Sequence, residues 1–256
     1  MKTTILIAAH KSYSMPEDPV YLPIQAGAEI NAPLEYAGDN SGENISARNK
    51  NFCELTVLYW AWKNLNADFI GLVHYRRHFA GRFALRKRNR ILTRQQLAKI
   101  LKDVPVIMPR KRNYFIESNF SHYVHAHNEQ DLTLTRKIIS EKYPEYLSAY
   151  DTVMKRSSGY RFNMCIMRRD LLDSYCTWLF DILFELEEKL DISGYSPYDA
   201  RVFGFISERL LDVWIEKNQP PLKTLPVINL EKQNWGRKIF HFLLRKVSAG
   251  KLGKVN

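Results

Sequence analysis

The chain has 256 residues, a formal net charge of +11 at neutral pH, and hydrophobic residues at 45% of its positions. This composition excludes an intrinsically disordered protein, and the length suffices to bury the core of one large α/β domain or two small ones. The positive charge fits nucleic acid, an anionic membrane or a phosphorylated ligand, and charge alone does not choose among the three.

The cysteine and hydropathy patterns favour a cytoplasmic protein. Cys53, Cys165 and Cys176 are odd in number and widely spaced, which predicts reduced thiols without disulfide or zinc-site pairing. No apolar run reaches the roughly 18 residues that span a bilayer. The apolar stretch near the N-terminus is too short for a signal peptide, because His10 and Lys11 follow it at once. We therefore expect residues 4–9 to form a first strand.

Residues 13–45 are rich in Pro, Gly, Asn and Asp, which predicts a long polar loop. The loop lacks the Gly-Lys-Ser/Thr ending of a P-loop, and no Gly-x-Gly-x-x-Gly motif is present. From residue 51 to residue 64, apolar and aromatic residues recur at helical spacing. This segment predicts an amphipathic helix whose aromatic rings belong to the core rather than to a sugar platform.

The most informative stretch runs from residue 68 to residue 79. Its first half is a short apolar run typical of a strand buried on both faces. In open α/β sheets, ligands bind beyond the carboxyl ends of the strands, and guanidinium groups bind phosphate with two hydrogen bonds. We therefore predict a site for a phosphorylated ligand on the residues that follow this strand and the first one. An exposed basic loop is the alternative. The site residues are His10, Lys11, His74, Tyr75, Arg76 and Arg77.

The middle of the chain predicts a basic loop over residues 80–94, facing lipid head groups or phosphate, then a helix capped by Thr93 and a strand over residues 104–109. His125 and His127 follow. Their spacing is not a zinc signature, and no cysteine is near. We expect these histidines to hydrogen-bond a substrate, or one of them to cap a helix that begins at Glu129.

The last third of the domain predicts alternating helices and strands: helices over residues 136–150, 170–188 and 200–217, and strands over residues 161–167 and 225–230. Arg201, Glu208 and Arg209 interrupt the apolar face of the last helix. Burying a lone charge is costly, so these side chains are either paired with one another or functional.

Residues 231–256 form a separate tail in which Trp235 and other apolar residues interleave with lysines and arginines. This pattern predicts a basic amphipathic helix that binds an anionic membrane surface. A helix packed on the domain, with its basic face in solvent, is the alternative. With the tail as an anchor, the protein would be peripheral on the inner face of the plasma membrane.

Two motif runs carry a family resemblance: Cys-Glu-Leu-Thr and Leu-Tyr-Trp-Ala-Trp-Lys-Asn between residues 53 and 64, and Ile-Gly-Leu-Val-His-Tyr-Arg-Arg at residues 70–77. Asn163 with Met164, and the segment from Arg201 to Arg209, match later motifs. These residues resemble a bacterial family of capsule and lipopolysaccharide O-antigen gene clusters, long labelled a domain of unknown function. The resemblance covers about residues 3–230. It implies one GT-A-like glycosyltransferase domain over residues 1–230, an α/β fold with a central mixed sheet flanked by helices.

The resemblance also implies a function, namely transfer of a hexose such as galactofuranose or galactose from a UDP-sugar to a lipid-linked or saccharide acceptor in polysaccharide biosynthesis. We assign Asp39, together with the strand-end residues, to binding of the nucleotide sugar. The residues that we assign to binding of the acceptor are His125, His127, Asn163, Arg201 and Arg209.

The metal site common in GT-A enzymes has no counterpart in the sequence, since no Asp-x-Asp motif occurs. We expect Arg76 and Arg77, helped by Lys11, to stabilise the leaving diphosphate in place of a metal, with no cofactor required. Asp39 or Asp68 still offers a carboxylate for a loosely held divalent ion, so the residues leave metal dependence open.

Inverting transfer requires a base that deprotonates the acceptor hydroxyl. Asp199 is the first candidate, because it lies between a Pro-Tyr turn and a helix, and a helix N-cap is its alternative role. Glu208 is the second candidate. It ranks lower because Arg201 or Arg209 can neutralise its charge. A retaining enzyme would need no such base.

Two other classes of function fit parts of the sequence. A nucleic-acid-binding protein would explain the charge, but no recognised binding motif is present, so we expect no nucleic-acid partner. A non-catalytic sugar-binding scaffold of a polysaccharide assembly complex is the other alternative.

Overall fold

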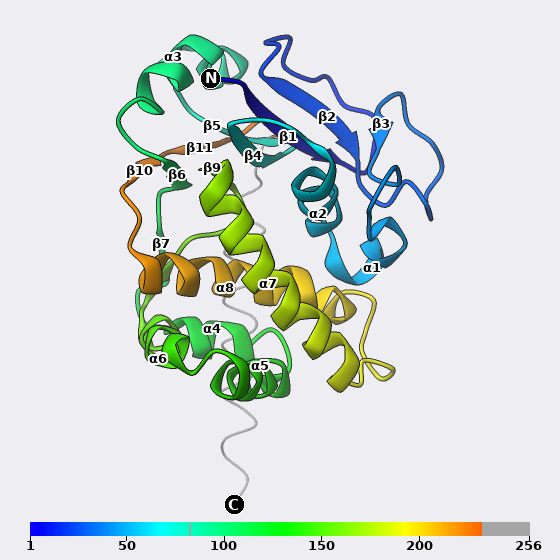
Figure 1. Cartoon of the computed structure of the whole chain (residues 1–256), viewed down its shortest axis with the longest axis vertical. Helices are drawn as coiled ribbons and strands as arrows, with labels where there is room; N and C mark the ends of the chain where they lie inside the picture. Colours follow the sequence, from blue (N-terminus) through cyan, green and yellow to red (C-terminus); the bar gives the residue numbers. More distant parts are fainter. Residues whose placement is uncertain (82, 232–256) are drawn as a thin grey trace, which may run out of the picture.

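The computed structural model describes residues 1–81 and 83–231, which fold around one mixed sheet (Figure 1). Its strands are β1 (Thr3–Ala9), β2 (Tyr21–Gln25), β3 (Ala37–Gly38), β4 (Phe69–His74), β5 (Arg77–Phe79), β6 (Val106–Pro109), β9 (Cys165–Arg168), β10 (Leu222–Leu225) and β11 (Val227–Asn229). The main path runs β10-β6-β9-β4-β1-β2-β3, and β5 and β11 extend it beyond the end of β4. Strands β1, β2 and β4 are parallel, whereas β9 is antiparallel to its neighbours β4 and β6.

Helices flank this sheet, as the sequence predicts. They are α1 (Asn49–Phe52), α2 (Leu55–Asn64), α3 (Arg94–Ile100), α4 (Asn119–Val124), α5 (Glu129–Lys142), α6 (Leu147–Lys155), α7 (Arg169–Lys189) and α8 (Val202–Asn218). Helices α4, α5 and α6 gather beyond α8, away from the main sheet (Figure 1). Strands β7 (Arg112–Asn113) and β8 (Ser158–Gly159) pair with each other in a separate two-stranded sheet. The expected α/β fold with a central mixed sheet is confirmed.

Strand β1 divides the core into two layers because its side chains alternate between the faces of the sheet. Leu6 belongs to the larger apolar cluster, which the packed helices complete, whereas Ile5 and Ile7 belong to the smaller cluster on the other face. Strand β4 alternates in the same way, and all its residues except His74 are buried. Beyond Thr3 and Thr4 at the start of β1, these two strands therefore have no exposed face, and charged side chains appear only after the strands end.

Two predicted helices are each broken in the structure. The helix expected over residues 51–64 is split into α1 and α2 at Cys53, whose φ of 53° is left-handed. The helix expected over residues 136–150 was wrong in its bounds: α5 begins earlier and ends before Pro144, and α6 follows it. Proline disfavours a helical conformation in the residue before it, and Tyr143 accordingly leaves the helix.

The strands also differ from the prediction in several places. The strand expected from residue 161 begins only at Cys165, because Phe162 and Asn163 have positive φ angles of 74° and 51°. The polar loop predicted over residues 13–45 contains β2. The sequence pattern did not indicate this strand, because a proline interrupts its apolar run. The strand expected over residues 225–230 is divided at Pro226, so that β10 pairs with β6 and β11 pairs with β5.

In the part of the chain that the structure describes, no helix combines the length and the apolar character needed to cross a bilayer. The amphipathic tail predicted from residue 231 lies outside the described residues, except for Glu231 itself.

Gly71, in the middle of β4, allows the close packing of β4 against β9. A Cβ atom at this position would lie 2.7 Å from Ile166 Cγ1 and 3.2 Å from the carbonyl oxygen of Cys165. We predict that Gly71→Ala lowers the free energy of unfolding by about 1–3 kcal/mol, measured by urea denaturation. The control is Gly194→Ala, where a Cβ would meet no atom within 4 Å. Equal stability of the two variants would contradict this packing account.

Candidate active site

A cleft of about 820 Å³ opens at the carboxyl ends of β1 and β4. Ala8 lies opposite His74 in this parallel pair, so the residues that follow both strands meet at one edge of the sheet. The opposite wall comes from α8 and from the loop that precedes β9. Seven Lys or Arg side chains line the cleft against two carboxylates, those of Glu54 and Glu208. The cations are Lys11, Lys50, Arg76, Arg77, Arg161, Arg201 and Arg209.

The strand-end wall contains all six residues that the sequence assigns to it, with Tyr75 at its centre. Tyr75 is 4% exposed, and the His10 ring meets it edge-on at a centroid distance of 4.9 Å. Lys11 Nζ lies 5.1 Å and the Arg76 guanidinium 5.4 Å from the centre of the Tyr75 ring. Tyr75 thus lines the cleft with little exposed surface and supports the neighbouring cations. Burial, reinforced by Arg76, lowers the pKa of His10, which keeps the imidazole neutral at pH 7.

A further carboxylate, outside the cleft lining, contacts two of these cations. Glu231 Oε2 lies 3.0 Å from Arg76 Nη1, and Glu231 Oε1 lies 3.5 Å from Lys11 Nζ. Oxygens of a phosphate group would make the same kind of charge-assisted contact. An anionic ligand that contacted Arg76 and Lys11 would therefore compete with the Glu231 carboxylate.

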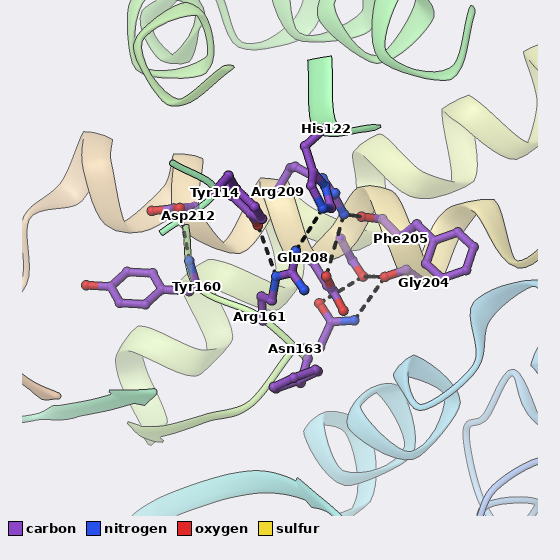
Figure 2. A network of polar contacts seen from close by, with 12 residues as sticks. Tyr114, His122, Tyr160, Arg161, Asn163, Gly204, Phe205, Glu208, Arg209 and Asp212 are labelled. Carbon is purple, nitrogen blue, oxygen red and sulfur yellow. Dashed lines mark hydrogen bonds and ion pairs between the residues drawn. The ribbon is translucent and has the colours of Figure 1, made fainter. Parts of the chain in front are cut away.

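The α8 wall presents Arg201, Phe205, Glu208 and Arg209 to the cleft, because residues three or four apart share one face of a helix. Burial raises the pKa of Glu208, and the charge of Glu54 adds to this effect, although Arg209 opposes it. Arg209 Nη1 lies 3.5 Å from Glu208 Oε2 (Figure 2). A carboxylate with a raised pKa is a stronger base than an ordinary glutamate.

Arg161 completes this wall from the loop before β9 (Figure 2). Its Nε donates to the Tyr114 hydroxyl at 3.1 Å, and its Nη2 contacts His122 Nε2 at 3.1 Å. Burial, with the charges of Arg161 and Arg209 nearby, lowers the pKa of His122 to about 3. His122 is therefore neutral at pH 7, and its Nε2 accepts a hydrogen bond from Arg161.

Asp199, the first base candidate, does not line the cleft and instead binds His127, which does. Asp199 Oδ1 lies 3.1 Å from His127 Nδ1, and the Ser196 hydroxyl donates to Asp199 Oδ2 at 2.6 Å. Hydrogen bonds from Ser196 and His127 lower the pKa of Asp199. Burial lowers the pKa of His127, so Nδ1–H of the neutral ring donates to Asp199. Asp199 thus orients a histidine at the edge of the cleft.

Three further residues predicted for the site lie outside the cleft lining. Asp39 is fully buried and accepts hydrogen bonds from the backbone of Gly27 and Ala28 and from the hydroxyls of Ser46 and Thr56, which fastens the loop after β2. His125 is exposed and contacts Glu117, 3.0 Å away. Asn163 is buried; its Nδ2 donates to Glu54 Oε1 at 2.8 Å and so supports a cleft residue from behind.

Three charged cleft residues, Lys50, Glu54 and Arg161, were not predicted from the sequence. Glu54 stands at the start of α2, directly after the break at Cys53, and lines the cleft. Arg161 looked like the first residue of a strand. Its signal was available, because an arginine beside an apolar strand without an acidic neighbour needs a partner elsewhere.

Within residues 1–81 and 83–231, no group of three or more His, Cys, Asp or Glu side chains is placed to hold a metal ion. The cations of the strand-end wall can neutralise an anionic ligand directly. The three cysteines are free, as predicted, and Cys53 lines the cleft beside Arg201. Burial raises the pKa of the Cys53 thiol to about 11, which makes it a poor nucleophile at neutral pH.

Comparisons with known proteins agree with this architecture. A profile of the family described as a domain of unknown function, DUF4422, matches residues 4–219. A solved apo structure of the bifunctional glycosyltransferase WbbM is similar to the chain, with a TM-score of 0.84 and 29% sequence identity. The match covers 91% of this chain and 46% of the WbbM chain, so this chain spans about half the length of that protein. A comparison with curated proteins finds no match.

Competition at Glu231 gives a first test of the cleft. We predict that Glu231→Gln binds inorganic pyrophosphate several-fold more tightly than the wild type in isothermal titration calorimetry, because it frees Arg76 and Lys11. Glu141→Gln is the control, since it makes the same charge change on α5. Unchanged or weaker binding by Glu231→Gln would show that Glu231 does not occupy an anion site.

Proposed function

The chain belongs to the DUF4422 family. From this membership, and from its likeness to about half of a bifunctional glycosyltransferase, we propose that it is a glycosyltransferase with a nucleotide-sugar donor. The observation that carries the proposal is the cationic cleft at the carboxyl ends of β1 and β4. Its volume of about 820 Å³ falls within the range of small-molecule sites. A diphosphate is the part of such a donor that needs cations.

The strand-end wall supports binding of the donor diphosphate. Arg76 and Arg77 offer planar guanidinium groups that match phosphate oxygens, and Lys11 adds a point charge beside them. Negative charge builds up on the leaving diphosphate in the transition state, so cations fixed at this position would accelerate transfer. We propose that these three residues do this work without a required metal ion.

The α8 wall supports binding and activation of the acceptor. Glu208 faces the cleft with a raised pKa, and we propose it as the base that deprotonates the acceptor hydroxyl in an inverting reaction. Asp199 would act indirectly, by holding the His127 ring in place through a hydrogen bond. Tyr198 and Phe205 flank the His127 ring, with centroid distances of 5.5 and 4.4 Å, and offer apolar faces to a sugar. Arg201 and Arg209 supply donors for its hydroxyl groups.

We propose a UDP-hexose donor, with galactose or galactofuranose as the sugar, and a lipid-linked or saccharide acceptor in cell-surface polysaccharide synthesis. The motif at residues 70–77 and the cationic cleft support this choice. Such an acceptor would hold the protein at the cytoplasmic face of the membrane, where the tail predicted from residue 231 would add to the attachment.

We predict that UDP raises the melting temperature of the wild type and that Arg76→Ala or Arg77→Ala weakens this shift. A ligand at about 100 times its dissociation constant adds about 2.7 kcal/mol to the free energy of unfolding. Arg168→Ala, which removes an exposed arginine paired with Asp170, is the control. If UDP, GDP, CDP and dTDP all leave the melting temperature unchanged, the nucleotide-sugar proposal fails.

We predict that Glu208→Gln lowers turnover of the donor by about a hundredfold or more while leaving UDP binding intact. Because the fold raises the pKa of Glu208, the ionised form costs stability above that pKa. The variant should therefore melt higher than the wild type at neutral pH. This gain should shrink as the pH falls through the raised pKa and vanish below the ordinary pKa of a glutamate. The acid limb of the wild-type rate profile should reflect the same raised pKa.

Glu216→Gln is the matched control, since Glu216 also lies on α8 but pairs with Arg156 outside the cleft lining. Turnover by Glu208→Gln within a few-fold of the wild-type value would contradict the assignment of the base. A lower melting temperature at neutral pH would mean that Glu208 serves the fold through Arg209.

A further inference from the structure

Residues 83–90 form a surface loop, here called the basic loop, that presents two large apolar side chains to solvent. Phe83 is 85% exposed and Leu85 is 92% exposed. Exposed apolar residues are ordinary by themselves, so the meaning of this pair depends on the charge that surrounds it.

The charge around these side chains has one sign. Arg86, Lys87, Arg88 and Arg90 lie within the basic loop, and the first three are exposed. The surrounding segment, residues 69–102, holds ten lysines and arginines and no aspartate or glutamate. A protein partner would have to supply many carboxylates beside an apolar pocket. The surface of an anionic bilayer combines negative charge with an apolar interior at the required depth.

The fold holds the base of the basic loop in place. Ala80 and Ile91 form a β-bridge across it, and the Gly81 amide donates to the carbonyl oxygen of Arg90 at 2.8 Å. Lys87 Nζ donates to the carbonyl oxygen of Asn229 at 2.7 Å, and Arg88 Nη1 donates to that of Ser14 at 3.0 Å. These bonds leave Phe83 and Leu85 pointing outward without packing partners in the core clusters.

The basic loop adjoins the cationic end of the cleft through Glu231. Lys87 Nζ donates to the carbonyl oxygen of Glu231 at 3.3 Å, and the carboxylate of the same residue contacts Arg76 and Lys11. A surface bound by the basic loop would therefore lie next to the cleft and next to the start of the tail.

We infer that the basic loop docks the protein on an anionic membrane, with Phe83 and Leu85 inserted at the level of the lipid head groups and the surrounding cations on lipid phosphates. This inference rests on the proposed function only for its purpose, which is to bring the cleft to a lipid-linked acceptor. Membrane binding itself requires no nucleotide sugar.

The test is flotation of the full-length protein with vesicles of phosphatidylcholine and phosphatidylglycerol, compared with vesicles of phosphatidylcholine alone. The wild type should bind the anionic vesicles, and the binding should weaken as salt increases. Replacing both apolar residues, Phe83→Ser with Leu85→Ser, should weaken binding by about tenfold or more, because two inserted side chains return to water. Both side chains are exposed, so the melting temperature should not change.

The matched control is Phe115→Ser with Ile116→Ser, which removes two adjacent side chains that are 83% and 77% exposed but lie beside Glu117. This control should bind vesicles like the wild type. Equal binding by the basic-loop variant and the wild type, or an equal loss in the control, would overturn the inference. Binding to duplex DNA in place of vesicles would also overturn it.

The two proposals fail separately. If the basic-loop variant loses vesicle binding but keeps the UDP-dependent melting shift, both stand. If vesicle binding depends on the basic loop while no nucleotide changes the melting temperature, the docking inference stands and the nucleotide-sugar proposal falls.

Discussion

The parallel pairing of β1 with β4 is the constraint on which the rest of the structure depends. Both strands are buried on both faces, so neither can hold a charge along its length. The charges appear where the strands stop, and the common register brings His10 and Lys11 beside the residues that follow His74. The lengths of the apolar runs in β1 and β4 thus determine the position of the cations that follow them in the cleft. Helix α8 supplies the facing wall because its charged residues recur at helical spacing.

The cleft concentrates like charges at a cost to stability. Arg76 and Arg77 are adjacent, and burial together with the Arg76 charge lowers the pKa of Arg77. Glu208 is held in the cleft although burial raises its pKa. A chain selected only for stability would exchange such groups for apolar ones or pair them fully, whereas functional sites are where such costs persist. Glu231 relieves part of the repulsion in the absence of ligand, and an anionic ligand would relieve more.

The sequence predicted the parts of the fold that depend on local patterns. Strands β1 and β4 and helices α7 and α8 follow from apolar runs and helical spacing, and their bounds agree with the structure within about two residues. It did not predict the break at Cys53, because a single left-handed residue inside an apolar periodic segment leaves no pattern. The long loop concealed β2 because Pro23 lies inside its short apolar run.

The same distinction applies to the site. Residues next to a strand end could be assigned from the sequence, since topology alone places them. Asp39 and Asp199 could not be separated from true cleft residues, because only the three-dimensional structure shows that one fastens a loop and the other holds His127. Glu54 and Arg161 were missed for the converse reason, since backbone breaks on either side of the cleft turn them inward.

The central claim is that the strand-end cations hold the diphosphate of a nucleotide sugar. A crystal structure of the protein with UDP tests this claim most directly. The account predicts diphosphate oxygens within hydrogen-bonding distance of the Arg76 and Arg77 guanidinium groups and of Lys11 Nζ, with Glu231 displaced and the space for the sugar facing Glu208. UDP bound away from the ends of β1 and β4, or bound with its diphosphate in solvent and Glu231 still on Arg76, would contradict it.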